Sequence, residues 1–180
     1  MVPLEVLFVT LIIVFGFVGA ARGYPRELGV TTLILTAMVV LTYMQPALAF
    51  FDQRIGPSLG FKITQPSGNS LEFFIYAFVF AAIVFASYAG ETFSFPGMPK
   101  KGRTGSLISF LNGSFNGYLI IGTIWYFLDN WSYIVGGKAL IQLPLTATAQ
   151  GLVAYLPPRI FDRNILLGII ALMLIMRVRR

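Results

Sequence analysis

The amino-acid sequence predicts an all-α integral membrane protein, a bundle of five transmembrane helices, or of four if the last apolar stretch does not span. Hydrophobic residues make up 57% of the 180 residues and charged residues 11%, with a mean hydropathy of +0.79. Soluble domains carry about 25% charged residues. Apolar stretches of spanning length recur along the chain, and the basic residues gather in short turns beside them. A chain of this composition needs lipid as its solvent.

Four of the five apolar stretches supply close to the ~20 residues that a spanning helix needs. They cover residues 4–21, 28–51, 71–90 and 105–128. The first is expected to be a retained helix and not a signal peptide, because its leading residues include Glu5 and no Lys or Arg. The fifth stretch, residues 164–176, has a length that is ambiguous between a span and an interfacial segment.

The distribution of basic residues predicts the orientation. Eight of the 13 Lys and Arg residues lie in two turns and at the C-terminus: Arg22, Arg26, Lys100, Lys101, Arg103, Arg177, Arg179 and Arg180. The side of the membrane that carries most basic residues is normally the cytoplasmic one. Five spans place all eight on that side, with the N-terminus outside and the C-terminus inside. Four spans would leave the C-terminal residues outside, so the charges favour a fifth span.

The turn between the first two stretches carries signals of its own. Gly23 suits a left-handed helix end, Pro25 suits the first turn of the next helix, and Glu27 is favourable near that helix's N-terminus. A tight antiparallel hairpin is therefore expected. Arg22, Arg26 and Glu27 are also a candidate site for a lipid headgroup or a protein partner; the alternative is that they only orient and cap the helices.

The fourth stretch has a face of small residues. Gly105, Ser109, Gly113 and Gly117 recur at every fourth position, a spacing that lets another helix backbone approach closely in a membrane. Packing within the bundle is the favoured interpretation, with the Ala-rich third stretch as the expected partner. The alternative is that the third and fourth helices pack against other membrane proteins or copies of this chain.

Three polar residues interrupt or end the fourth stretch. Asn112 and Asn116 share one helix face, and an interhelical hydrogen bond is favoured over a polar pathway. Asp129 lies among Trp125, Tyr126, Trp131 and Tyr133, an aromatic group typical of the membrane interface. A solvated carboxylate is expected there, with ion or proton handling as the alternative.

Several function classes are excluded by composition. The chain has no Cys and no His, which rules out disulfides, His- or Cys-based metal and haem sites, and His-dependent nucleophilic catalysis. No HExxH or phosphate-loop motif occurs, so neither catalysis nor a cofactor is expected. The net charge of +6 resides largely in orienting turns, so nucleic acid is not an expected partner; the lipid bilayer is.

Two parts of the sequence resemble a known family. The first hairpin reads Gly19-Ala-Ala-Arg22-Gly23-Tyr-Pro-Arg26-Glu27, and the fourth stretch places Ser109, Gly113 and Gly117 in a frame that ends in Phe127-Leu128-Asp129. This pattern resembles the colicin V production protein (CvpA-like) family of bacterial inner-membrane proteins, over about residues 1–130. The chain departs from it where an Asp-Arg pair is replaced by Gly105-Ser106 and an arginine by Asn116.

The resemblance implies a CvpA-like four-helix membrane region over residues 1–130. Residues 131–163 are then expected to form an extracytoplasmic or interfacial segment, and residues 164–180 a short transmembrane helix with a basic tail. The implied function is a structural or accessory role in the cell envelope or in export, in the bacterial cytoplasmic membrane. Two alternatives stay open: an accessory or scaffold subunit of a respiratory or photosynthetic complex, and a channel or transporter.

Overall fold

A computed structural model of the chain describes residues 3–60, 63–64, 70–89, 95, 102–135, 138–139, 141 and 145–178. Its elements are α1 (Leu4–Arg22), α2 (Tyr24–Arg54), α3 (Gly56–Leu59), α4 (Ser70–Ala89), α5 (Arg103–Asn130), β1 (Ile134–Val135), β2 (Lys138–Ala139), α6 (Ala147–Val153), α7 (Pro157–Ile160) and α8 (Arg163–Val178). The two strands form a two-residue antiparallel ribbon. The predicted all-α architecture is otherwise confirmed, and α1, α2, α4 and α5 are each long and apolar enough to cross a membrane.

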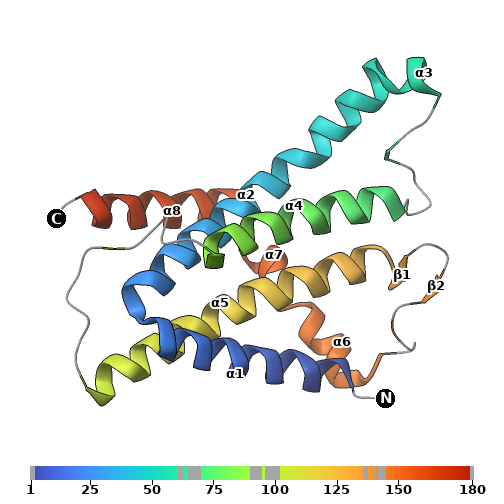
Figure 1. Ribbon diagram of the computed structural model, residues 1–180. Helices are drawn as coiled ribbons and strands as arrows, with labels where there is room; N and C mark the ends of the chain where they lie inside the picture. The colour runs from blue at the N-terminus through green and yellow to red at the C-terminus, as the bar shows by residue number, and fades with distance from the viewer. Residues whose placement is uncertain are drawn as a thin grey trace.

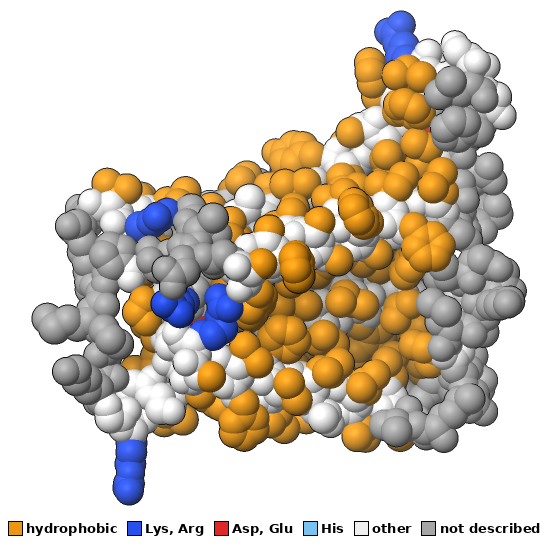
Figure 2. All heavy atoms as spheres, viewed as in Figure 1, with side chains coloured by type: hydrophobic (Ala, Val, Ile, Leu, Met, Phe, Trp, Pro, Cys, Tyr) orange, Lys and Arg blue, Asp and Glu red, His pale blue; other side chains and the backbone are white. Residues whose placement is uncertain are grey.

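The long helices lie side by side and define two ends of the bundle (Figure 1). At the Arg22 end, α1 finishes and α2 and α5 begin; at the Asn130 end, α5 finishes and α1 and α4 begin. Buried side chains come mostly from α2 and α5. Hydrophobic side chains also cover much of the face seen in Figure 2, with Lys and Arg at its edges. This apolar exterior is the one expected of a protein that lipid surrounds.

The α1–α2 hairpin is tight, as the sequence predicts, because a single residue joins the two helices. Gly23 has φ +88°, a backbone conformation that favours glycine, and its N–H donates to the Gly19 carbonyl at 2.9 Å. Pro25 lies in the first turn of α2, where its missing N–H costs no helical hydrogen bond.

The small-residue face of α5 packs against α1, so the expectation that the third stretch would be its partner is wrong. A Cβ atom added to Gly19 would lie 2.5 Å from the Ser109 carbonyl oxygen and 2.6 Å from Gly113 Cα. The two backbones are therefore in direct contact. Helix α4 packs chiefly on α2, while its Ala81 and Ala86 are exposed. Glycines lie on both α1 and α5, which permits a closer approach than alanines allow.

Helix α2 is longer than a bilayer requires. Its 31 residues correspond to about 47 Å at 1.5 Å per residue, against a hydrocarbon core of about 30 Å. Pro46 lies inside the helix, where it removes a backbone hydrogen bond. The final turns of α2 diverge from the other helices, as Figure 1 shows.

The segment after α5 folds back into the bundle. Pro157 at the start of α7 lies against Gly122 of α5, and the Tyr118 hydroxyl donates to the Tyr155 carbonyl. Gly122 precedes Asn130 by eight residues, which places the contact about 12 Å inside the Asn130 end. Residues 131–163 are expected to be extracytoplasmic or interfacial, and α7 within this segment packs on the last third of α5.

Helix α8 contains the fifth apolar stretch, and it is shorter than a span. Its 16 residues correspond to about 24 Å, less than the hydrocarbon thickness. It begins partway along the bundle and runs toward the Arg22 end (Figure 1), with Leu166 and Met173 buried. Because α8 runs in this direction, it brings Arg177 to the same end of the bundle as Arg22 (Figure 1).

Candidate functional site

A group of polar residues is buried near the Arg22 end, where α1, α2, α4 and α5 meet. We call it the Glu27 cluster; it consists of Arg22, Glu27, Thr31, Tyr88 and Asn116. Glu27 and Asn116 are both 0% exposed. Ionisable groups in membrane segments are costly and mark functional positions by default, so this cluster is the first candidate site.

The Glu27 carboxylate is enclosed by partners from three helices. Arg22 Nε lies 2.9 Å from Oε1, an ion pair that lacks the alignment of a hydrogen bond. Asn116 Nδ2 donates to Oε2 at 2.9 Å and is 3.1 Å from the Glu27 carbonyl oxygen. The Tyr88 hydroxyl lies 3.5 Å from Oε2. These contacts compensate the carboxylate for the water that it lost on burial.

Arg22 joins α1 to α4 as well as to α2. Its Nη1 donates to the Tyr88 carbonyl at 2.9 Å, and its guanidinium carbon lies 4.8 Å from the centre of the Tyr88 ring. The side chain is 25% exposed, so the cluster reaches the surface at the arginine. A planar guanidinium can satisfy a carboxylate, a carbonyl and an aromatic face together.

Thr31 completes the cluster on the α2 side. Its Oγ1 lies 2.7 Å from Asn116 Oδ1 and 2.9 Å from the Glu27 carbonyl oxygen, and its single proton serves one acceptor at a time. Asn112 Nδ2 reaches the same hydroxyl only at 3.5 Å. Asn116 therefore makes the close interhelical contacts, and Asn112 lies at the edge of the cluster.

The structure thus combines residues that the sequence presented separately. Arg22 and Glu27 from the first hairpin meet Asn116 from the small-residue helix, one turn from Gly113. Arg26 is exposed and Gly23 forms the turn. The roles of Tyr88 and Thr31 escaped sequence reasoning, because a tyrosine or threonine in an apolar stretch is unremarkable without its neighbours.

Asp129 belongs to a second polar group, near the Asn130 end. Its Oδ1 accepts from the Tyr133 hydroxyl at 2.8 Å, and its Oδ2 accepts from Arg159. Trp125 Nε1 donates to the Tyr133 oxygen at 3.2 Å. Burial raises the pKa of Tyr133 to about 12, the bond from Trp125 opposes this shift, and the bond to Asp129 adds to it. Asp129 is thus held by two partners, and its side chain stays 20% exposed, so the carboxylate expected to be solvated is also paired.

Both polar groups join helices through ion pairs and hydrogen bonds. Within the described residues, no set of three or more His, Cys, Asp or Glu side chains could hold a metal ion. The small-residue face containing Gly105, Ser109, Gly113 and Gly117 is buried, which leaves it no room for another protein. The chain was compared with protein-family models, curated proteins and solved structures, and no match was found.

Proposed function

We propose that the chain is a CvpA-like polytopic protein of the bacterial cytoplasmic membrane, with a structural or accessory role in the cell envelope or in export and without catalysis. The observation that supports this most is the position of the hairpin residues. Glu27 has no exposed surface, and its carboxylate is held by Arg22 and Asn116. An acid so enclosed is suited to joining helices and poorly placed to meet a soluble substrate.

The proposed orientation places the Arg22 end in the cytoplasm. Arg22, Arg103 and Arg177 all belong to helix ends on that side of the bundle. Basic residues beside membrane helices are retained on the cytoplasmic side, and they also favour contact with anionic lipid headgroups. The N-terminus then lies outside and the C-terminus inside.

Gene deletion with complementation tests the proposed role. Loss of the gene should lower tolerance to detergent and acid or alter secretion, and the wild-type gene should restore both. A Glu27→Ala gene should restore less, because the variant separates α1, α2 and α5. Glu5→Gln is the control, since Glu5 lies at the other end of α1 and accepts from Thr146. A deletion strain indistinguishable from its parent under these stresses would contradict the proposal.

A second candidate, a channel or transporter, is favoured by one observation. The chain re-enters the bundle at α7 and leaves it as the short helix α8. Interrupted helices that meet near the membrane midplane are characteristic of transporters. Ion or solute flux in proteoliposomes, compared with protein-free vesicles, tests this candidate; equal flux in both would reject it.

A further inference from the structure

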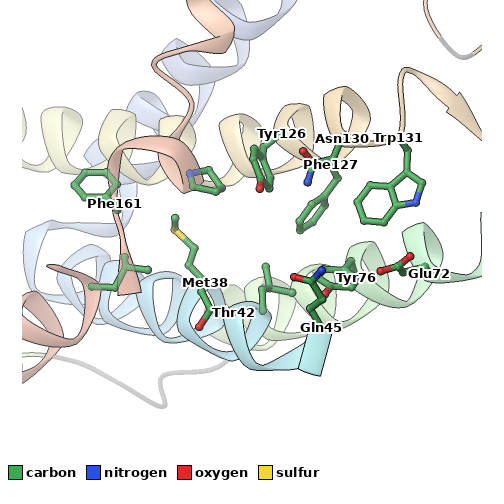
Figure 3. A pocket seen from close by; sticks show the side chains of 13 residues that line it. Met38, Thr42, Gln45, Glu72, Tyr76, Tyr126, Phe127, Asn130, Trp131 and Phe161 are labelled. Atoms are coloured by element: carbon green, nitrogen blue, oxygen red, sulfur yellow. The ribbon is translucent and has the colours of Figure 1, made fainter. Parts of the chain in front are cut away.

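A cavity of about 490 Å³ lies at the Asn130 end, between α2, α4, α5 and the α7–α8 segment. We propose that it binds an amphiphilic organic cation, meaning a single ammonium or phosphonium charge attached to an apolar body. The proposal goes beyond an envelope role and depends neither on the Glu27 cluster nor on catalysis. Figure 3 shows the side chains that line the cavity.

Aromatic rings make up much of the cavity wall. Tyr76, Tyr126, Phe127, Trp131 and Phe161 all line it. The ring centre of Tyr76 lies 5.7 Å from that of Trp131 and 6.0 Å from that of Phe127, so three of these rings form a continuous group. Aromatic faces attract organic cations, and several rings around one charge are a known way to bind quaternary ammonium groups.

The charge of the cavity has the sign that this ligand needs. Within the described part of the chain, Glu72 is the one charged residue that lines the cavity, and no ion pair or hydrogen bond there engages its carboxylate. Asp52 adds a second negative charge close enough to act on Glu72. The Asp52 carboxylate already accepts hydrogen bonds from Ile63 and Thr64, so Glu72 is the acid that would attract a cation in the cavity.

Arg159 contacts a residue of the cavity wall without lining the cavity itself. The guanidinium carbon of Arg159 is 6.0 Å from the centre of the Tyr126 ring, but this arginine is already paired with Asp129. Because Arg159 is paired with Asp129, it does not pair with Glu72.

The two ends of the cavity differ in polarity. Glu72 and Gln45 lie toward one end with Trp131, whereas Met38 and Phe161 lie toward the other (Figure 3). The charged group of a ligand would therefore sit by Glu72 and its apolar body by Met38. A free lipophilic cation and the ammonium headgroup of a membrane lipid share this chemistry.

Binding of tetraphenylphosphonium to the purified full chain in phosphatidylglycerol nanodiscs tests the proposal. Tetraphenylborate, which has the same shape and the opposite charge, is the matched probe. Saturable phosphonium binding is expected, with an affinity on the order of tenfold weaker in Glu72→Gln. Tyr126→Leu should also weaken it, and Glu5→Gln should leave it unchanged. In a Trp125→Phe background, the fluorescence of Trp131 reports occupancy of this cavity.

The proposal is overturned if Glu72→Gln and Tyr126→Leu both bind the cation as the wild type does, or if tetraphenylborate binds equally well. A saturable signal that leaves Trp131 fluorescence unchanged would also refute it, since the site would lie elsewhere. Phosphatidylcholine nanodiscs identify the source. If lipid headgroups occupy the cavity, wild type and Glu72→Gln should bind the phosphonium with equal affinity in these nanodiscs. If the natural ligand is a free cation, the affinity difference between the two proteins should persist.

Discussion

Replacing Asn116 by leucine is the sharpest test of the Glu27 cluster. Leucine has a similar volume, so the substitution removes hydrogen bonds while leaving little cavity. It deletes the donation to Glu27 Oε2 at 2.9 Å, the 3.1 Å contact with the Glu27 carbonyl and the 2.7 Å bond from Thr31. Glu27 keeps its ion pair with Arg22 and the 3.5 Å approach of Tyr88.

The expected loss of stability follows from the number of bonds and their setting. Interhelical hydrogen bonds in membrane proteins average about 0.6 kcal/mol, with a maximum of about 1.7 kcal/mol. Three such contacts, one of them to a carboxylate, make about 2 kcal/mol the expected loss in the free energy of unfolding. Asn116→Asp should cost more, because it places a second carboxylate where an amide now donates to Glu27.

Unfolding by SDS in mixed micelles, followed by circular dichroism, measures this loss. Asn112→Leu is the matched control, since the same substitution one turn earlier removes only a 3.5 Å contact; about 0.5 kcal/mol or less is expected for it. If Asn116→Leu unfolds with the wild-type free energy, or if the two variants are equally destabilised, the cluster does not hold the helices as argued.

Three further predictions concern other parts of the fold. Gly19→Ala should destabilise the bundle by about 1–3 kcal/mol, because the new Cβ meets the α5 backbone; Gly168→Ala, with open space around it, should unfold like the wild type or slightly later. The difference in unfolding free energy between wild type and Tyr133→Phe should be constant below about pH 10, where the Tyr133 hydroxyl is neutral in both the folded and the unfolded protein. It should fall as the pH rises to about 12, because the unfolded hydroxyl ionises first; an advantage independent of pH through that window would contradict the burial of Tyr133. In cells, an impermeant maleimide should label Gln150→Cys from outside and Arg177→Cys only after permeabilisation; external labelling of both would reject the proposed orientation.

The long apolar helices were predictable because their signal is local. Long apolar runs specify α1, α2, α4 and α5 with lipid as the surrounding solvent, and the Gly23-Tyr24-Pro25 turn specifies the first hairpin. The fifth stretch was harder, since its length alone does not separate a span from a partial helix. Its position depends on Pro157 docking beside Gly122, a contact between elements that no local pattern contains.

The candidate site was predictable in its residues and not in its assembly. Glu27 lies in the first turn of α2, whereas Asn116 lies thirteen residues after the start of α5. Counting residues from the start of each helix therefore does not predict that these two side chains meet. Their meeting requires α5 to extend beyond α2 at the Arg22 end. Likewise, the Ala-rich stretch of α4 was the expected partner of the small-residue face of α5, but the close contact between Gly19 and Gly113 places α1 there.

By itself, the sequence determined the apolar helices, the tight first turn and the segregation of basic residues, because each follows from the composition and period of a short segment. Only the tertiary structure decided which helices touch, that Arg22, Glu27 and Asn116 form one cluster, and that aromatic side chains and Glu72 line one cavity. Those features depend on helix offsets and on steric fit between residues far apart in the chain, which local periodicity does not encode.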